Sequence, residues 1–365
     1  MKFSCTQENL NRGLALVNHV ANKNANLPIL ANVLIEADKS GLKLSTTNLE
    51  VGITSSIRGK TAEPGKITIP ARLLSDYVNL LPNERIDFVA KDNELQISGQ
   101  KSQTKIKGLS AEEFPVIPQV EKGEVFKVKA RDFKNAVSAV SFAVAYDESR
   151  PEISGVYTIL QKDQAILVAT DSYRLAEKQV GLAEASKKEE KVIVPVRTYQ
   201  ELSRILEEEN EELTIAINES QIQFTVKENQ LVSRVIDGQY PDYRQIIPGE
   251  QKTKIKAEVN ELSKAIKTAS LFCKSGINDI NLQFSDGAIK IFTANSQVGE
   301  SQTKIDAKIE GEPNQIVFNY RYLLDGLANL NSEEVEIAII DNGNPGVLRP
   351  VGEQNYLYII MPIKQ

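Results

Sequence analysis

The 365-residue sequence has very few of the residues from which common catalytic and metal sites are built. His19 is its one histidine, and Cys5 and Cys273 are its two cysteines. Two thiols cannot make a disulfide framework or a four-ligand zinc site. With no partner histidine, His19 is expected to lie at a helix surface or to be partly packed. Both thiols are expected to be packed or partly exposed residues rather than nucleophiles.

Long apolar segments are also missing from the sequence. No run of 18 apolar residues occurs, so no transmembrane helix is expected. The first residues, MKFSCTQENLNRG, lack the apolar core of a secretory signal. We therefore expect a cytoplasmic protein that does not act at a membrane.

Motifs that bind phosphate, dinucleotides or metal ions are absent. The sequence contains no GxGxxG, HExxH or EF-hand pattern. The nearest approach to a phosphate loop, between Gly59 and Gly65, is one residue too long and has Ile67 where a hydroxyl is required. The sequence therefore predicts no catalytic residue, no metal site and no cofactor, which favours a binding or scaffold role.

An excess of positive charge is the last feature that is lacking. The 43 Lys and Arg stand against 49 Asp and Glu, for a net charge of −6. This balance disfavours simple electrostatic binding to DNA, although it is compatible with a local basic surface. The predicted helices carry slightly more basic than acidic residues, but ordinary charge placement at helix ends explains that excess equally well.

What the chain does contain is an internal repeat. Its length indicates two or three domains, and 41% apolar and 25% charged residues are ordinary for a folded protein. The repeat has a period of about 120 residues, longer than the 20–50 residues of the common repeat families. Whole domains are therefore repeated.

Three landmarks recur in the same order in each repeat. The first is an amphipathic helix with apolar residues at i, i+4 and i+7. The second is a strand that ends in threonine, and the third is a strand that runs into another helix at Pro or Asn, both of which suit such a junction. The three helices are marked by Leu10, Leu14 and Val17, by Phe133, Val137 and Val140, and by Leu262, Ile266 and Ala269; the threonines, taken as equivalents, are Thr46, Thr170 and Thr293; the junctions are Pro70, Pro195 and Asn319.

Each repeat is therefore predicted to be an α+β domain with a largely antiparallel sheet, because short turns join its strands. Stretches rich in Pro, Gly and charge lie near residues 122 and 250. The predicted domains are residues 1–121, 122–249 and 250–365.

Several longer motifs resemble those of a known family over the whole chain. They are LPILANVLIEA (27–37), RPEISGVY (150–157), ATDSYRLA (169–176), DGQYPDYRQIIP (237–248), FNYRYLLDGL (318–327) and MPIKQ (361–365). With these motifs the chain resembles the bacterial DNA polymerase III beta subunits, the sliding clamps.

The resemblance implies three tandem repeats of the DNA clamp fold, with helices lining a central hole and antiparallel sheets on the outer rim. It implies a homodimeric, head-to-tail ring that acts as a processivity factor, without catalysis of its own. Such a ring encircles double-stranded DNA, slides along it and tethers the DNA polymerase III catalytic subunit. Its other partners would be the clamp loader complex and, through short peptide motifs, repair and translesion polymerases.

The resemblance also implies a peptide-binding pocket that includes the C-terminus. Apolar walls with a few polar groups suit the burial of Leu or Phe anchors. The residues carried over to this pocket are Ile153, Thr170, Tyr173, Arg174, Leu175, Pro241, Ile246, Ile277, Asn319, Tyr322, Pro345, Met361, Pro362 and Ile363. Ser172 and Tyr173 stand where many relatives carry Gly and His.

Two further sets of residues are expected. Some basic residues should face DNA, and we assign Lys23, Lys134, Arg150, Arg197 and Arg204 to that set. By analogy with the family, the dimer seam should bring Thr104 and Ile106 of one chain against Leu271 and Phe272 of the other.

Without the resemblance, three interpretations compete. Triplication and the missing catalytic residues favour a ring or scaffold that binds DNA and peptides. A three-domain enzyme with a cleft between repeats would require clustered titratable residues, which the sequence does not offer. A repeat-based adhesion protein would normally carry a secretion signal.

Overall fold

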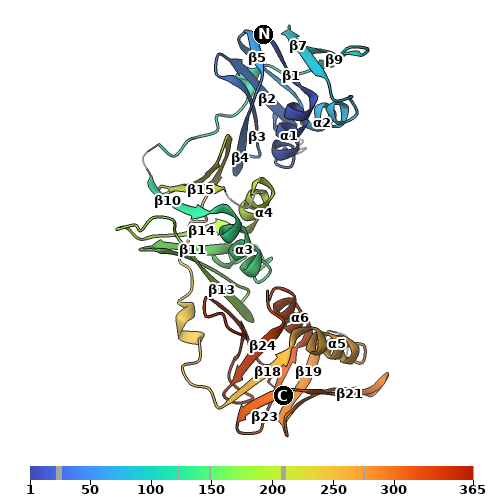
Figure 1. The fold of residues 1–365 in the computed structure, drawn as a ribbon, viewed down its shortest axis with the longest axis vertical. Coiled ribbons are helices and arrows are strands. Elements are labelled where there is room, and N and C mark those ends of the chain that lie inside the picture. The colour runs from blue at the N-terminus through green and yellow to red at the C-terminus, as the bar shows by residue number, and fades with distance from the viewer. Residues whose placement is uncertain (22–26, 122, 148, 207–210, 274–275, 365) are drawn as a thin grey trace. The chain divides into compact units, whose positions relative to one another are not determined.

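The computed structural model describes residues 1–21, 27–121, 123–147, 149–206, 211–273 and 276–364 (Figure 1). It falls into two compact units, which are described separately below. Unit 1 comprises Met1–Asp132, Leu182–Glu190 and Arg197–Val235, and unit 2 comprises Phe133–Gly181, Lys191–Val196 and Ile236–Gln365. None of the described helices combines the length and the apolar character needed to cross a membrane.

The first predicted helix of each repeat is present. These helices are α1 (Gln7–Val17), α3 (Ala130–Ser141) and α5 (Val259–Ser270). The apolar residues that predicted them are at most 3% exposed. The threonine before α1 caps it, because Thr6 Oγ1 accepts a hydrogen bond from the N–H of Asn9 at 3.3 Å. Burial of one apolar stripe therefore positions each helix, as the 3.6-residue period predicts.

The second predicted helix of each repeat follows a strand without a loop. These helices are α2 (Ala71–Asn79), α4 (Val196–Ile205) and α6 (Tyr320–Ala328). At the start of α6, Asn319 Oδ1 accepts a hydrogen bond from the N–H of Arg321 at 3.0 Å. Pro70 stands at the corresponding junction before α2, with a φ of −51° that suits a helix start. Pro195 directly precedes α4 in the same way, so all three junction predictions are confirmed. Short 3-10 helices are η1 (Pro28–Ala31), η2 (Ala111–Glu113), η3 (Pro151–Ile153) and η4 (Tyr243–Ile246).

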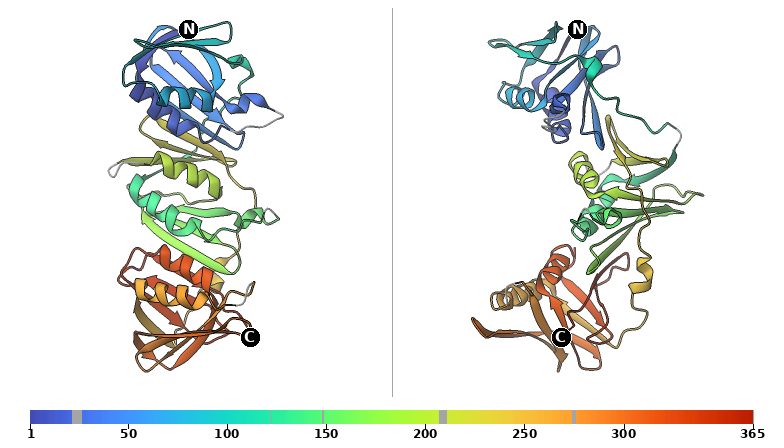
Figure 2. Two further views of the ribbon diagram at one scale, coloured as in Figure 1. Left: turned by 90° about the vertical axis from the view of Figure 1, so that its right-hand side faces the viewer. Right: turned by 180° about the vertical axis from the view of Figure 1, so that it is seen from behind.

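The described residues of unit 1 form two antiparallel sheets. The five-stranded sheet has the order β5 (Lys60–Glu63), β1 (Lys2–Thr6), β7 (Arg85–Lys91), β8 (Glu94–Ser98) and β9 (Gln103–Lys107). The eight-stranded sheet has the order β10 (Glu124–Lys129), β15 (Glu212–Ile217), β16 (Gln221–Val226), β17 (Asn229–Arg234), β4 (Val51–Ile57), β3 (Gly41–Thr47), β2 (Asn32–Asp38) and β6 (Gly65–Pro70). Helices α1 and α2 lie side by side, and α1 packs on β3 and β4 (Figures 1 and 2).

The described residues of unit 2 form two further antiparallel sheets, apart from Glu190 at the start of β14, which belongs to unit 1. The nine-stranded sheet has the order β14 (Glu190–Pro195), β11 (Gly155–Gln161), β12 (Gln164–Thr170), β13 (Arg174–Gly181), β26 (Tyr356–Ile360), β25 (Gly346–Pro350), β24 (Glu334–Ile339), β18 (Thr253–Glu258) and β22 (Lys308–Gly311). The four-stranded sheet has the order β21 (Gly299–Asp306), β20 (Ala288–Asn295), β19 (Asp279–Ser285) and β23 (Asn314–Asn319). Helices α5 and α6 pack against each other.

Two of the sheets are shared between repeats, which the sequence did not predict. In unit 1, β17 of the central repeat pairs with β4 of the first, with Leu231 opposite Ile53. In unit 2, β13 of the central repeat pairs with β26 of the third, with Leu175 opposite Ile359. The strands of the central repeat are thus divided between two sheets, and for that reason three repeats make two compact units.

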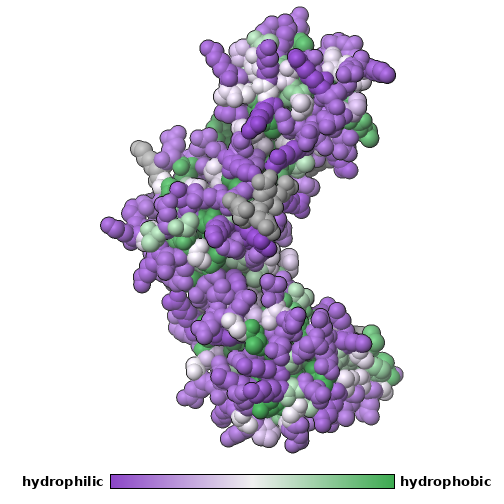
Figure 3. Space-filling model, viewed as in Figure 1, coloured by the Kyte–Doolittle hydropathy of each residue, from purple (hydrophilic) through white to green (hydrophobic). Residues whose placement is uncertain are grey.

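The described residues separate by hydropathy as expected for an α+β fold. The faces between helices and sheets are filled by apolar residues, among which Phe88, Phe133, Phe224 and Tyr358 are almost fully buried. Hydrophilic residues predominate on the face drawn in Figure 3, with hydrophobic residues scattered among them. The predicted fold class, α+β with antiparallel sheets, is confirmed.

Candidate functional site

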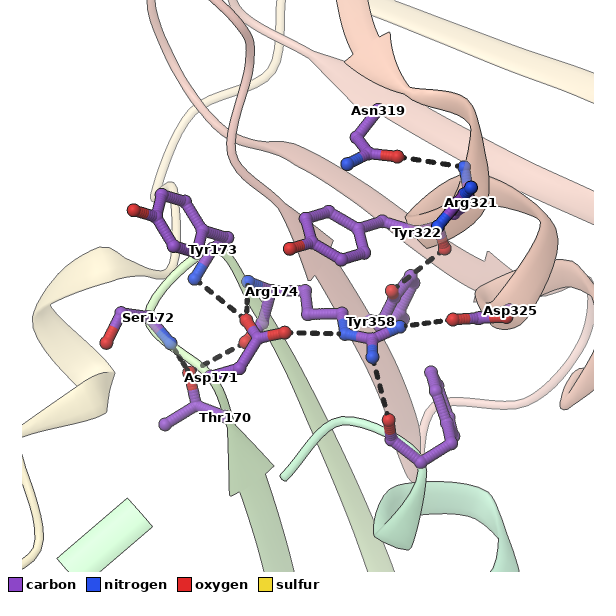
Figure 4. A network of polar contacts seen from close by, with 11 residues as sticks. Thr170, Asp171, Ser172, Tyr173, Arg174, Asn319, Arg321, Tyr322, Asp325 and Tyr358 are labelled. Atoms are coloured by element: carbon purple, nitrogen blue, oxygen red, sulfur yellow. Dashed lines mark hydrogen bonds and ion pairs between the residues drawn. The ribbon is translucent and has the colours of Figure 1, made fainter. Parts of the chain in front are cut away.

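A tight turn between β12 and β13 carries Tyr173, an exposed residue of the predicted peptide pocket. The Thr170 hydroxyl donates to the carbonyl oxygen of Arg174 at 2.7 Å and accepts from the N–H of Ser172 at 3.1 Å. Asp171 Oδ1 accepts from the N–H groups of Tyr173 and Arg174, at 2.9 and 3.0 Å. Polar side chains therefore fix the backbone, while the Tyr173 side chain is 63% exposed (Figure 4).

The same turn occurs between β3 and β4 in unit 1. The Thr47 hydroxyl donates to the carbonyl oxygen of Val51 and accepts from the N–H of Leu49, both at 3.0 Å. Asn48 Oδ1 accepts from the N–H groups of Glu50 and Val51. Thr47, rather than the predicted Thr46, is therefore the structural equivalent of Thr170.

The error at Thr46 has a physical reason. Adjacent residues of a strand point to opposite faces, so a register error of one residue exchanges the two sides of the sheet. Thr46 is fully buried and donates to the carbonyl oxygen of Val17, at the end of α1, at 2.6 Å. Thr293 does not end its strand either, because β20 continues to Asn295. The prediction that Thr46, Thr170 and Thr293 are equivalent was wrong.

The guanidinium of Arg174 joins this turn to two helices of unit 2. Its Nε donates to Asp171 Oδ2 at 2.9 Å, and its Nη2 donates to the carbonyl oxygen of Phe142, just beyond α3, at 2.9 Å. Its Nη1 donates to Asp325 Oδ2 on α6 at 2.6 Å (Figure 4). Because Arg174 is only 8% exposed, this predicted pocket residue anchors the turn from inside the unit.

Tyr322 of α6 lies against the same guanidinium. The Cζ atom of Arg174 is 4.6 Å from the centroid of the Tyr322 ring, a cation–π distance. The hydroxyl of Tyr358 on β26 donates to the carbonyl oxygen of Tyr322 at 2.9 Å. Gly326 permits this close packing, since a Cβ there would lie 2.3 Å from Cε1 of Tyr358.

The C-terminal segment joins the turn to the four-stranded sheet of unit 2. The N–H of Met361 donates to the carbonyl oxygen of Tyr173 at 2.9 Å, and the N–H of Ile363 donates to that of Val317 on β23 at 2.8 Å. Met361 is 36% exposed, and Pro362 and Ile363 are partly buried. The predicted tail residues therefore lie beside the predicted turn residues.

Apolar residues pack beneath the turn. Ile153, Leu175 and Ile359 are at most 2% exposed and belong to one core cluster. Tyr240 and Tyr243, on the segment that also carries Pro241 and Ile246, pack on this cluster.

The other predicted pocket residues are distributed over the same unit. Ile246 and Ile277 are 40% and 46% exposed, and Pro241 is exposed. Ile277 precedes Asn278, whose carbonyl oxygen accepts from Tyr320 on α6 at 2.8 Å. Partly buried Pro345 precedes Gly346, the partner of Ile360 in the sheet, and Asn319 caps α6.

Sequence families match almost the whole chain. Their descriptions are DNA polymerase III beta subunit, N-terminal domain (residues 1–118), central domain (residues 127–242) and C-terminal domain (residues 244–364). The chain belongs to the DNA polymerase III beta subunit family.

Individual members of the family match over at least 92% of their length. The chain is 34% identical to the beta sliding clamp of Synechococcus elongatus, with 100% of this chain and 99% of that protein covered. It is 28% identical to the Staphylococcus aureus beta sliding clamp, with 93% and 92% covered. The clamp of Pseudomonas aeruginosa, solved bound to griselimycin, superposes with a TM-score of 0.96 at 28% identity over 100% of both chains. The Bacillus subtilis clamp superposes with a TM-score of 0.95 at 28% identity over 100% of this chain and 99% of that one.

These comparisons confirm the predicted family and the three-domain DNA clamp fold. As a beta subunit of DNA polymerase III, the chain is a sliding clamp and a processivity factor of DNA replication. The prediction of a non-catalytic subunit is confirmed by membership of this family.

The basic residues predicted to face DNA lie in different settings in the clamp. Arg197 and Arg204 are exposed on α4, with Arg204 Nε 3.7 Å from Glu201, and Lys134 is partly buried on α3. Lys23 falls outside the described residues. Arg150 lies just before η3 rather than on a long helix, and its side chain donates hydrogen bonds to Ser172 and Glu152.

The residues predicted for the dimer seam lie on one edge strand and directly after one helix. Thr104 and Ile106 are on β9, the last strand of the five-stranded sheet. Ile106 is 5% exposed and stands opposite Leu95 of β8, whereas Thr104 is partly buried. Leu271, directly after α5, is 76% exposed, and Phe272 is partly buried.

Sequence reasoning did not find Asp171, Phe142, Asp325 and Tyr358, which complete the network around Arg174. Asp171 had a usable signal, since Asp directly after a strand commonly accepts hydrogen bonds from the backbone of a turn. Phe142, Asp325 and Tyr358 have no local signal, because each meets Arg174 or Tyr322 only through the tertiary fold.

Proposed function

We propose that two copies of the chain close head to tail into a ring around double-stranded DNA, and that partner proteins bind the ring through unit 2. The partners are the DNA polymerase III catalytic subunit, the clamp loader complex, and repair and translesion polymerases that carry short peptide motifs. The ring works in the cytoplasm, and its domains are residues 1–121, 122–249 and 250–365.

Two edge strands support a seam between copies. Strand β9 is at the edge of the five-stranded sheet, and β21 is at the edge of the four-stranded sheet. An edge strand offers unpaired main-chain donors and acceptors to another chain. A head-to-tail interface between two different patches repeats until the assembly closes, which suits a ring. The exposed side chain of Leu271 would be covered at this seam.

The observation that carries the peptide site is the meeting of three elements around exposed apolar groups. The turn at 170–174, helix α6 and the tail at 361–363 are joined by hydrogen bonds of Arg174 and Met361. Tyr173 and Met361 remain exposed above buried Leu175. A rigid frame with exposed aromatic and apolar groups suits the capture of a peptide with Leu and Phe anchors.

The ring is tested by its mass and by its topology. Light scattering should give a mass close to twice 40.4 kDa. After loading by a clamp loader, the protein should stay on circular DNA and leave linearised DNA from its ends. A monomer that remains equally on both DNAs would contradict the ring.

The peptide site is tested by direct binding. A short fluorescein-labelled peptide with Leu and Phe anchors should bind the full chain, and griselimycin, bound by the P. aeruginosa clamp, should displace it. Absence of binding by both compounds would overturn the site.

The DNA-facing assignment is tested by charge neutralisation. Replacement of Lys134, Arg197 and Arg204 together by Gln should lower clamp-dependent processivity without unfolding the chain, because each phosphate contact adds affinity. Replacement of the exposed sheet residues Lys43, Lys60 and Lys66 by Gln is the matched control and should leave processivity unchanged. Equal processivity of the two triple variants would contradict the assignment.

A further inference from the structure

We propose that Arg150 is a positioning residue of the peptide site, which acts through Ser172 to hold the turn that carries Tyr173. This inference rests on the proposed peptide-binding function. It assigns to Arg150 a role other than the DNA contact predicted from the sequence.

Two hydrogen bonds orient the guanidinium of Arg150. Its Nη1 donates to Ser172 Oγ at 2.8 Å, and its Nε donates to Glu152 Oε1 at 3.2 Å. Because the guanidinium is planar, two bonds to different nitrogens determine its plane. The start of η3, which leads into buried Ile153, is thereby joined to the apex of the turn at 170–174.

The backbone at Ser172 favours glycine rather than serine. Its φ is +78°, in the left-handed region that residues with a Cβ rarely adopt. A glycine would fit this conformation more easily but could not accept a hydrogen bond from Arg150. The geometry of the turn therefore does not explain a serine at position 172, whereas the hydrogen bond that its hydroxyl accepts from Arg150 does.

The equivalent turn of unit 1 has the same backbone conformation but no side-chain hydrogen-bond acceptor at the matching position. Leu49 occupies the same position with a φ of +77°, and Thr47 and Asn48 make the same backbone hydrogen bonds as Thr170 and Asp171. A leucine side chain cannot accept a hydrogen bond. The turn thus forms without an arginine, and the link through Ser172 belongs to the turn that carries the proposed site.

This link would act directly on groups that meet the peptide. Ser172 precedes Tyr173, which is 63% exposed. The carbonyl oxygen of Tyr173 accepts a hydrogen bond from the N–H of Met361. A shift of the apex would move both the aromatic ring and the tail. If the apex is held in place before the peptide binds, less conformational entropy is lost on binding and the affinity is higher.

The test compares Ser172→Ala, Arg150→Gln and the double variant in the full chain. The labelled peptide with Leu and Phe anchors is the probe, and its dissociation rate and affinity are measured. Each single variant should bind roughly three- to tenfold more weakly, the size expected for one hydrogen bond. The affinity of the double variant should equal that of the single variant that binds less tightly, because both changes remove the same contact.

Three controls separate positioning from a general effect on the fold. Leu49→Ala, in the matched turn, should leave peptide affinity unchanged. Ser172→Gly should weaken binding as Ser172→Ala does, although it relieves the backbone, and melting temperatures should show that all variants are folded. Ser172→Asn should restore much of the affinity, because Asn tolerates a positive φ and its side-chain oxygen can accept from Arg150.

Unchanged affinity in Ser172→Ala, or additive losses in the double variant, would overturn the proposal. Tighter binding by Ser172→Gly would also overturn it, since backbone strain would then outweigh the hydrogen bond. If the unaltered chain binds neither the peptide nor griselimycin, the proposed function itself fails, and this is distinguishable because no variant is needed to see it.

Discussion

Arg174 and Asp325 are 151 positions apart in the sequence, and the Nη1 of the arginine donates to Oδ2 of the aspartate at 2.6 Å. The same guanidinium lies 4.6 Å from the ring centroid of Tyr322, which is one helical turn before Asp325 on α6. One buried cation therefore holds the turn that carries Tyr173 against the helix that carries Tyr322.

Arg174→Ala should destabilise the chain. It leaves the Phe142 carbonyl and the Asp171 carboxylate without their buried donor, so we expect a loss of about 2–3 kcal/mol in the free energy of unfolding, measured by urea denaturation. Asp325→Asn is the matched control and should cost less than about 1 kcal/mol, because the Asp325 side chain is 50% exposed. Equal stability of Arg174→Ala and the unaltered chain would show that the network does not contribute.

Removal of residues 361–365 should abolish peptide binding and leave the chain folded. The deletion removes the main-chain bonds from Met361 to Tyr173 and from Ile363 to Val317, but it takes no fully buried side chain from the described core. Binding of the labelled peptide and thermal unfolding should be measured side by side. A truncated chain that binds the peptide with full affinity would exclude the tail from the site.

Tyr173→Ala and Leu175→Ala should separate binding from stability. Tyr173 is 63% exposed, so its loss should weaken peptide binding at least tenfold with little change in melting temperature. Leu175 is fully buried in the core cluster, and its truncation should cost about 2–5 kcal/mol of stability. A large fall in the melting temperature of Tyr173→Ala would contradict this division.

Alkaline pH should weaken the fold through Cys5. Burial, and secondarily the charge of Asp87, raises the pKa of the Cys5 thiol from 9.0 to about 12. The folded chain keeps the thiol proton where the unfolded chain loses it, so this stability is complete below pH 9 and is lost as the pH rises toward 12. Cys5→Ala should show a smaller decline in melting temperature above pH 9 than the unaltered chain. Parallel declines would show that Cys5 does not contribute.

Leu271→Asp should separate the two copies of the ring. The Leu271 side chain is 76% exposed in one chain, and a charge there would be buried at the proposed seam. Light scattering should then report a monomer. Val116→Asp, at a residue that is 91% exposed, is the matched control and should remain a dimer. A dimeric Leu271→Asp variant would show that Leu271 does not lie at the seam.

The α-helices could be predicted from local sequence patterns. Leu10, Leu14 and Val17 recur at helical spacing, and all three are fully buried in α1. The junction at Asn319 was also predictable, because its side chain caps α6 through a contact only two residues away. Local patterns succeed where the contacts that decide the structure are themselves local.

The equivalence of threonines failed for the opposite reason. Thr46 and Thr47 are neighbours in the sequence but face opposite sides of β3, and only their partners distinguish them. Val17 and Val51, which accept the hydrogen bonds of Thr46 and Thr47, come from different elements. A spacing between similar residues cannot choose between two registers that differ by one position.

By itself, the sequence determined the three repeats, the six described α-helices and the α+β class, because apolar periodicity and turn residues act over a few positions. Its longer motifs were sufficient to indicate the clamp family. Only the tertiary structure decided that the sheets continue from one repeat into the next, that Thr47 matches Thr170, and that Arg174 reaches Asp325 and Arg150 reaches Ser172. Strand edges and buried charges select their partners across the whole chain, and that choice is made by packing and desolvation rather than by neighbours in sequence.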